Sequence, residues 1–132
     1  DKFKIVIIPS YRTPEEGIKK AYGAFSSNHH VINTDDKKAD LSSLAIADFI
    51  IVTCDSTSMI SEAAVTEKPL YIAMMKPKKR NLRFKKFYSQ LSNWVITKEL
   101  NNVVENWSYE SLNEVSRIAP LIKSRMKQNG II

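Results

Sequence analysis

The sequence is poor in the residues that disulfides, metal sites and glycine-rich nucleotide loops need. Its 132 residues include one cysteine, two histidines and three glycines. The single cysteine, Cys54, excludes an internal disulfide and is consistent with a reducing compartment. Three glycines exclude a Walker loop and a glycine-rich dinucleotide turn. His29 and His30 are neighbours that point in opposite directions on a strand, so with one cysteine we expect no metal site.

Long apolar runs are also missing. The longest nearly uncharged stretch, residues 44–54, is interrupted by Asp48 and is far too short to cross a bilayer. Apolar residues make up 43% and charged residues 26%, a globular composition of one domain's length. Because residue 1 is Asp rather than Met, we expect residues 1–132 to be a single domain cut from a longer protein.

The positive charge is concentrated in one segment. The net charge is +6, and seven bases with no acid lie between Lys76 and Lys86. Without those seven bases, the rest of the chain carries 13 bases and 14 acids, so the whole excess belongs to this segment. A single dense patch indicates one anionic target, whereas a solvated loop and helix face remains the plain alternative. The residues expected to form the anion or membrane patch are Lys78, Lys79, Arg80 and Arg83.

Hydrophobic periodicity predicts strands that alternate with helices along the whole chain. This order calls for an α/β fold, a three-layer Rossmann-like open parallel sheet with helices on both faces. The expected strands are residues 3–8, 30–33, 49–53, 69–74 and 95–97. The expected helices begin at Thr13-Pro14 and lie near residues 41–47, 59–66, 84–91 and 112–126. The stripe Phe84, Phe87, Tyr88 and Leu91 makes one helix face, which is more typical of a core than of a nucleobase platform.

The best candidate site follows the strand at residues 49–53. Residues 54–58 (Cys-Asp-Ser-Thr-Ser), here called the elbow, bring three hydroxyls to the start of a helix. The N-terminus of a helix carries partial positive charge and free N–H groups, which favour a phosphate. Asp55 would repel a phosphate, so it is expected to cap the helix or to orient a hydroxyl. Simple capping by Ser and Asp explains the spacing equally well.

Two further residues fit a nucleotide site. Glu62 lies one turn into the same helix, where a carboxylate can accept bonds from ribose hydroxyls. Arg12 lies in the loop of residues 10–13, and its planar fork suits a pyrophosphate. Each also has a structural alternative, because an acid is favourable near any helix start and a lone Arg on a loop is commonly a solvated charge.

These residues resemble a known family. The run from Ala47 to Thr53, followed by Asp-Ser-Thr-Ser-Met-Ile-Ser-Glu-Ala at residues 55–63, is similar to the signature of the mitochondrial-fission family named after the plant protein "Elongated Mitochondria", which has many bacterial members. Residues 10–14 (Ser-Tyr-Arg-Thr-Pro) and 66–69 (Thr-Glu-Lys-Pro) resemble two other motifs of that family. In the second motif Glu67 replaces a glycine, and a glycine expected near Asn93-Trp94 is also missing.

The resemblance implies a role in nucleotide-sugar binding. The family resembles two-domain GT-B glycosyltransferases, so this chain would be their C-terminal, donor-binding half. A Glu seven residues before a Pro commonly binds the donor ribose there, and Glu62 and Pro69 have that separation. Carried over, Ser56, Thr57, Ser58 and Met59 would contact the diphosphate, with Arg12 across from them. No cofactor is implied beyond the nucleotide sugar as substrate. A missing N-terminal domain would complete the cleft, so this chain alone is not expected to turn over substrate.

A second class of function stays open. The basic segment of residues 76–86 would also suit a non-catalytic adaptor that docks on protein partners or on an anionic membrane surface. The same segment could face an anionic lipid-linked acceptor. Nucleic acid is a poorer partner, since no reading module is recognisable. We expect a cytoplasmic protein, peripheral at the inner face of a membrane if the patch binds lipid.

Overall fold

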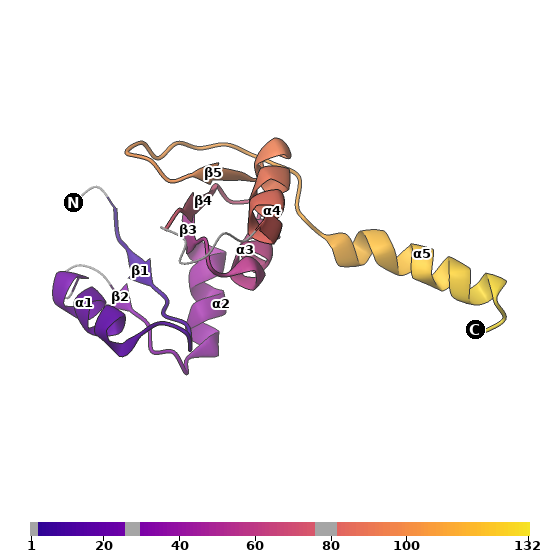
Figure 1. Cartoon of the computed structure of the whole chain (residues 1–132). Helices are drawn as coiled ribbons and strands as arrows, with labels where there is room; N and C mark the ends of the chain where they lie inside the picture. The colour runs from indigo at the N-terminus through magenta and orange to yellow at the C-terminus, as the bar shows by residue number, and fades with distance from the viewer. Residues whose placement is uncertain (1–2, 26–29, 76–81) are drawn as a thin grey trace. The chain divides into compact units, whose positions relative to one another are not determined.

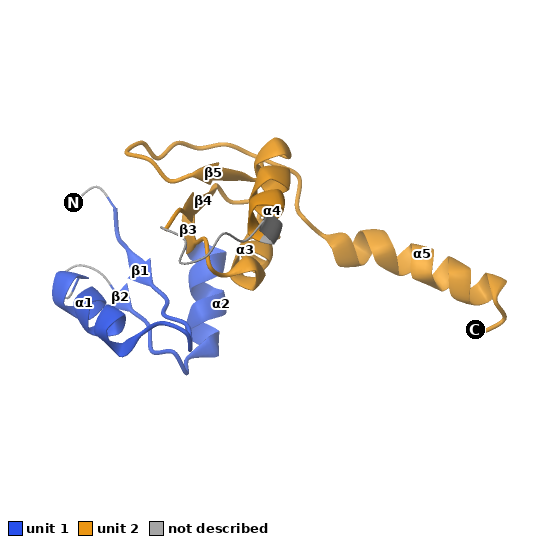
Figure 2. Ribbon diagram, viewed as in Figure 1, with its two compact units in different colours: residues 1–47 blue, residues 48–132 orange. Residues whose placement is uncertain are grey.

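The computed structural model describes residues 3–25, 30–75 and 82–132, without the side chains of Leu82 and Arg83. The described chain contains five strands and five helices in alternating order (Figure 1). It divides into two compact units, residues 1–47 and 48–132 (Figure 2). All strand pairs are parallel, in an open sheet in each unit, so the α/β class and the Rossmann-like parallel arrangement are confirmed.

Unit 1 is small and only partly buried. Its strands β1 (Val6–Ile7) and β2 (His30–Val31) pair in parallel, and its helices are α1 (Glu15–Phe25) and α2 (Lys37–Ile46). The first strand was expected to be a longer buried one, but Val6 is 39% exposed. Helix α2 begins four residues earlier than the apolar pattern predicts, because the Asp36 side chain caps it by accepting a bond from the Ala39 N–H at 2.9 Å.

Unit 2 has a three-stranded sheet with β4 in the middle. The strands are β3 (Ile50–Thr53), β4 (Leu70–Ala73) and β5 (Thr97–Glu99). Because β4 has a neighbour on each side, its Leu70, Tyr71 and Ile72 are buried, whereas burial alternates along the edge strand β3. The Cys54 N–H donates to the Ala73 carbonyl at 3.1 Å, which holds the carboxyl ends of β3 and β4 together.

The helices of unit 2 are α3 (Thr57–Ala64), α4 (Leu82–Asn93) and α5 (Glu114–Gln128). Helix α3 buries Ile60, Ala63 and Ala64, and α4 buries Leu91. The predicted core role of the α4 stripe is confirmed for Leu91, while the three aromatic residues of the stripe are half-buried.

Two non-glycine residues turn the chain in the left-handed backbone region. Glu67 has φ 61° and Val95 has φ 59°. Val95 ends α4 in a Schellman motif, since the Val95 N–H donates to the Ser92 carbonyl at 2.9 Å and the Ile96 N–H donates to the Leu91 carbonyl at 3.0 Å. The family pattern has a glycine at position 67, where the backbone is left-handed, and another near residues 93–94, beside the left-handed Val95.

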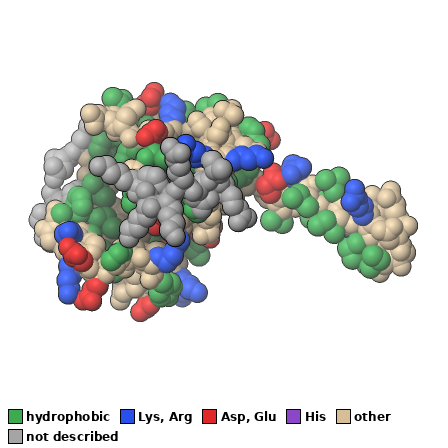
Figure 3. Space-filling model, in the orientation of Figure 1, with side chains coloured by type: hydrophobic (Ala, Val, Ile, Leu, Met, Phe, Trp, Pro, Cys, Tyr) green, Lys and Arg blue, Asp and Glu red, His purple; other side chains and the backbone are tan. Residues whose placement is uncertain are grey.

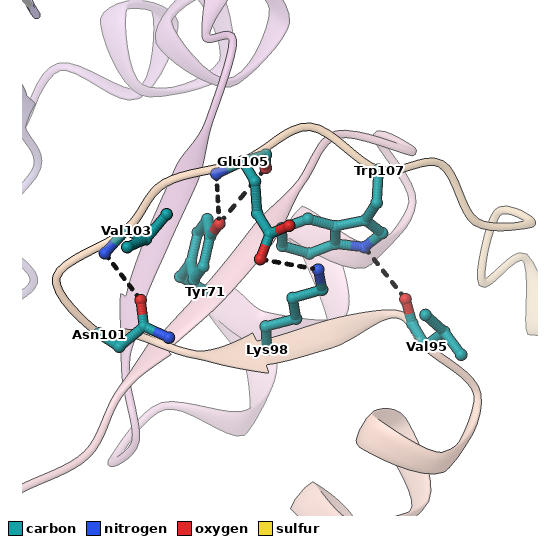
Figure 4. A network of polar contacts seen from close by, with 7 residues as sticks. All are labelled: Tyr71, Val95, Lys98, Asn101, Val103, Glu105 and Trp107. Carbon is teal, nitrogen blue, oxygen red and sulfur yellow. Dashed lines mark hydrogen bonds and ion pairs between the residues drawn. The ribbon is translucent and has the colours of Figure 1, made fainter.

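The segment after β5, residues 100–112, returns across the sheet and is here called the return segment. Tyr71 of β4 anchors it: the Tyr71 hydroxyl accepts a bond from the Glu105 N–H at 2.9 Å and donates to the Glu105 carbonyl at 3.3 Å (Figure 4). Lys98 pairs with Glu105 at 3.4 Å and lies over the Trp107 ring at 4.6 Å. The indole N–H of Trp107 donates to the Val95 carbonyl at 3.1 Å.

The return segment ends against helix α3. The Ser111 hydroxyl donates to the Val65 carbonyl at 3.0 Å, and the Leu112 N–H donates to the Ala64 carbonyl at 3.4 Å. These two bonds satisfy carbonyls that the end of a helix leaves without an intrahelical donor.

Helix α5 combines apolar and basic side chains at its surface, and none of its residues is buried (Figure 3). Asn113 caps it by accepting a bond from the Ser116 N–H at 3.1 Å, and the helix continues through Pro120. Among the described residues, no helix has both the length and the apolar character needed to cross a membrane.

Candidate functional site

The elbow joins the carboxyl end of β3 to the N-terminus of α3. The first N–H bonded within the helix is that of Ile60, which donates to the Ser56 carbonyl at 3.1 Å. The N–H groups of Thr57, Ser58 and Met59 precede it, so helix geometry gives them no intrahelical acceptor. Of these three side chains, Ser58 is exposed and the other two are half-buried.

Ser56 is the most informative residue of the elbow. It occupies the N-cap position of α3, is only 4% exposed, and makes no side-chain capping bond. Its hydroxyl has no hydrogen-bond partner among the residues that the structure describes. Buried hydroxyls are nearly always hydrogen-bonded, so this group has an unmet requirement at the start of a helix. Ser56 therefore occupies the capping position of α3 without a side-chain capping bond.

Asp55 interacts with the strand that precedes it. Its carboxylate accepts a bond from the Thr53 hydroxyl at 2.6 Å. Of the two roles expected for Asp55, this geometry favours orienting a hydroxyl. A carboxylate that already accepts a short hydrogen bond has part of its charge balanced, which lessens its repulsion of an anion at the helix start.

Besides the Ala73 carbonyl, two further groups from outside the elbow hold Cys54. The Tyr88 hydroxyl, from helix α4, donates to the Cys54 carbonyl. The Met75 N–H, just beyond β4, donates to the Cys54 Sγ at 3.3 Å. Burial raises the pKa of the Tyr88 hydroxyl, and the nearby Cys54 and Asp55 raise it further, so this hydroxyl remains a donor through the neutral range.

The predicted ribose ligand, Glu62, lies on the same helix as the elbow hydroxyls. It is exposed, and α3 therefore presents the hydroxyls and the carboxylate within two turns of each other. The hydroxyl of the adjacent Ser61 already uses its proton within the helix, because it donates to the Thr57 carbonyl at 2.9 Å.

Arg12 belongs to unit 1, so only its own loop can be described. The Ser10 N–H donates to the Thr13 hydroxyl at 2.9 Å, and the Thr13 N–H donates to the Ser10 carbonyl at 2.8 Å. This closed turn exposes the Arg12 side chain. Thr13, expected to cap α1, uses its hydroxyl inside the turn instead. The pairing of Arg12 with the elbow stays a prediction.

Most of the predicted basic patch lies outside the described residues, namely Lys78, Lys79 and Arg80, as does His29. Arg83 falls in the first turn of α4, and only its backbone is described. Lys85 and Lys86 of the same helix are described and exposed. In the described part of the chain no three His, Cys, Asp or Glu side chains come together as a metal site would require.

Sequence reasoning missed two residues of the elbow environment, Thr53 and Tyr88. By its pattern Thr53 is only the end of a strand, although a hydroxyl two residues before an Asp can form a local side-chain pair. Tyr88 was assigned to the core by its spacing, which says nothing about where its hydroxyl points.

The fold and this site define an α/β protein with parallel open sheets and a polar bend at a helix N-terminus. Comparison with known proteins gives the family: residues 1–126 match the model of the family described as "Mitochondrial fission ELM1". The chain belongs to that family.

Two curated relatives show how the chain relates to longer proteins. It is 40% identical over 100 residues to the "Uncharacterized protein RP120" of Rickettsia prowazekii (strain Madrid E), a match that covers 74% of this chain and 28% of the relative. It is 28% identical over 126 residues to the "Mitochondrial fission protein ELM1" of Arabidopsis thaliana, covering 92% of this chain and 29% of the relative. The chain thus spans less than a third of the length of either relative. No solved structure matches it.

Proposed function

We propose that this chain is the nucleotide-sugar-binding part of a glycosyltransferase-like protein of the mitochondrial fission family. The observation that carries the proposal is Ser56, a buried hydroxyl at a helix N-cap with no partner among the described residues. A diphosphate oxygen would supply the missing partner and would lie at the positive end of α3.

The elbow supplies the remaining groups that a diphosphate needs. The N–H groups at the start of α3 donate to phosphate oxygens, and the hydroxyls of Thr57 and Ser58 lie in the same turn. Glu62, one turn further, accepts from the two ribose hydroxyls, and the family resemblance adds Arg12 as a cation for the diphosphate. A separate N-terminal domain would bring the acceptor. The basic segment favours an anionic lipid-linked sugar as the class of that acceptor.

Calorimetry with UDP, GDP, CMP and their sugars tests the proposal. We expect binding of at least one nucleotide, and we expect Glu62→Ala to weaken it by about 1–3 kcal/mol, because the ribose hydroxyls lose a charged acceptor. Glu67→Ala is the matched control, since it removes an exposed acid from the turn after the same helix. No heat with any nucleotide at millimolar concentration would contradict the proposal.

Ser56→Ala separates ligand binding from helix capping. Removing an N-cap that bonds its helix costs about 1 kcal/mol of stability. Since Ser56 makes no such bond, we expect the midpoint of urea unfolding to stay unchanged while nucleotide affinity falls. A destabilised variant with unchanged affinity would show that the hydroxyl serves the fold alone.

A second candidate function is a non-catalytic adaptor on an anionic surface. Helix α4 supports it, because Lys85 and Lys86 are exposed and the helix contains no acid. Co-sedimentation with vesicles containing acidic lipid should then fall steeply between low and high salt. Absence of binding at low salt removes this candidate, and nucleotide binding without lipid binding leaves the first.

A further inference from the structure

The structure assigns Tyr88 a positioning role at the elbow, an inference that rests on the proposed function. Its hydroxyl reaches the Cys54 carbonyl from a helix 34 residues further along the chain. We infer that this contact holds the bend in the shape that presents the α3 N-terminus to a phosphate, although Tyr88 itself touches no ligand.

The backbone bond within the bend is weak, although the Thr53 hydroxyl donates a short bond to the Asp55 carboxylate. The Ser56 N–H reaches the Thr53 carbonyl only at 3.4 Å, at the long end for a hydrogen bond, and the Ser56 side chain does not cap the helix. The backbone path of residues 54–56 therefore depends in part on groups that hold it from outside. Within the described chain, the bonds to Cys54 itself come from β4 and its next residues and from Tyr88.

Peptide geometry explains why the Cys54 carbonyl is the effective point of attachment. The Cys54 carbonyl and the Asp55 N–H share one rigid plane, so fixing the oxygen fixes the direction in which the chain leaves the strand. The next residue is the N-cap Ser56, and α3 starts immediately after it. A small rotation of that plane would redirect the N–H groups at residues 57–59.

Two aromatic neighbours hold the Tyr88 ring in place. The ring stacks on Phe84 with centroids 6.2 Å apart and an interplanar angle of 17°, and it meets the edge of Phe87 at 5.6 Å. Helix α4 therefore holds the phenol by apolar contacts, and its hydroxyl is left to bond the elbow. The substitution Tyr88→Phe would keep the ring contacts and lose only the bond to Cys54.

Tyr88→Phe and Tyr71→Phe form a matched pair of variants. These two tyrosines of unit 2 both use their hydroxyls on backbone groups, but Tyr71 bonds Glu105 of the return segment, whereas Tyr88 bonds Cys54. We expect Tyr88→Phe to weaken nucleotide binding by a factor of about 3 to 10, with little change in thermal stability. Tyr71→Phe should lower the midpoint of thermal unfolding by about 3–8 °C and leave affinity within a factor of about 2. Amide hydrogen exchange without ligand adds a second readout, in which Tyr88→Phe accelerates exchange at residues 55–59.

The outcomes separate this inference from the proposed function. If the parent protein binds a nucleotide and Tyr88→Phe binds it equally well, the positioning role is wrong and the proposed function stands. If the parent binds no nucleotide, the proposed function fails, and the positioning role fails with it. A Tyr88→Phe variant that loses stability and affinity together, with exchange accelerated throughout unit 2, would reduce Tyr88 to a core residue.

Discussion

The side chain of Val95 disfavours the backbone conformation that this residue adopts. Val95 is β-branched, yet it occupies the left-handed position that ends α4, where a Cβ crowds the following carbonyl. Helix α5 ends in the same way with a glycine, Gly130, at φ 64°. The return segment is attached at this turn, because the Val95 carbonyl accepts a hydrogen bond from the Trp107 indole N–H.

Val95→Gly should therefore stabilise the protein. Relief of the left-handed strain is worth about 1–2 kcal/mol, and the added freedom of the unfolded chain offsets part of it, so we expect a net gain of about 0.5–1 kcal/mol. Urea unfolding measures it. Val95→Thr, which keeps the β-branch on a side chain that is 54% exposed, should show little change. A loss of stability in Val95→Gly would mean that packing of the Val95 methyls outweighs the strain.

Two tyrosines should make stability fall at alkaline pH. The pKa values of Tyr88 and Tyr109 are raised above the ordinary value of about 10, in both mainly by burial. The folded state thus holds these protons more tightly than the unfolded chain, and the free energy of unfolding falls as the pH rises above about 10. Thermal unfolding between pH 8 and 11 measures the fall. Tyr88→Phe should reduce its slope, and the double variant with Tyr109→Phe should reduce it further; a slope equal to the parent's would show that Tyr88 does not contribute.

Most elements could be predicted from the sequence because their signals are local. Periodicity and β-branched runs gave all five strands and all five helices, with boundaries displaced by a few residues. The start of α2 was missed because its first turn is polar. Contacts between distant residues were predicted less well. The return segment has no periodicity, and its bond to Tyr71 comes from Glu105, which lies 34 positions further along the chain. The polar bend could be predicted as a loop at a helix start, whereas the unbonded state of the Ser56 hydroxyl could not.

The attachment of the return segment to β5 should show measurable coupling. Lys98 lies over the Trp107 ring at 4.6 Å with 36% of its side chain exposed. A double-mutant cycle of Lys98→Met and Trp107→Leu, measured by urea unfolding, should give a coupling energy of about 0.5–1 kcal/mol. Lys98→Arg retains a cation over the ring and should keep the coupling. If the stability changes of the two single variants add in the double variant, the ring and the ammonium lie near each other without a measurable interaction.

Across the whole chain, the hydrophobic core belongs to unit 2. Apart from Pro9, every buried hydrophobic residue among those described lies between Ile50 and Ile96, and unit 1 leaves Phe3 and Ile5 at least 40% exposed. Apolar burial is the main source of stability, so the two units should differ in how readily they open.

Amide hydrogen exchange should resolve that difference. We expect the slowest exchange in β3 and β4, and exchange faster by at least about tenfold in β1 and β2, since local opening costs less where few apolar contacts are broken. Mass spectrometry of peptic fragments separates the two regions. Equal protection in both would show that unit 1 is stabilised by something other than its own core.

Cys54 gives this chain a built-in reporter. It is the only thiol, it lies half-buried in the bend that precedes α3, and its sulfur accepts the Met75 N–H at 3.3 Å. A maleimide dye or a disulfide reagent would consequently mark one position without any engineering. The speed of that labelling, followed by simple absorbance, would register any molecule that shields the bend.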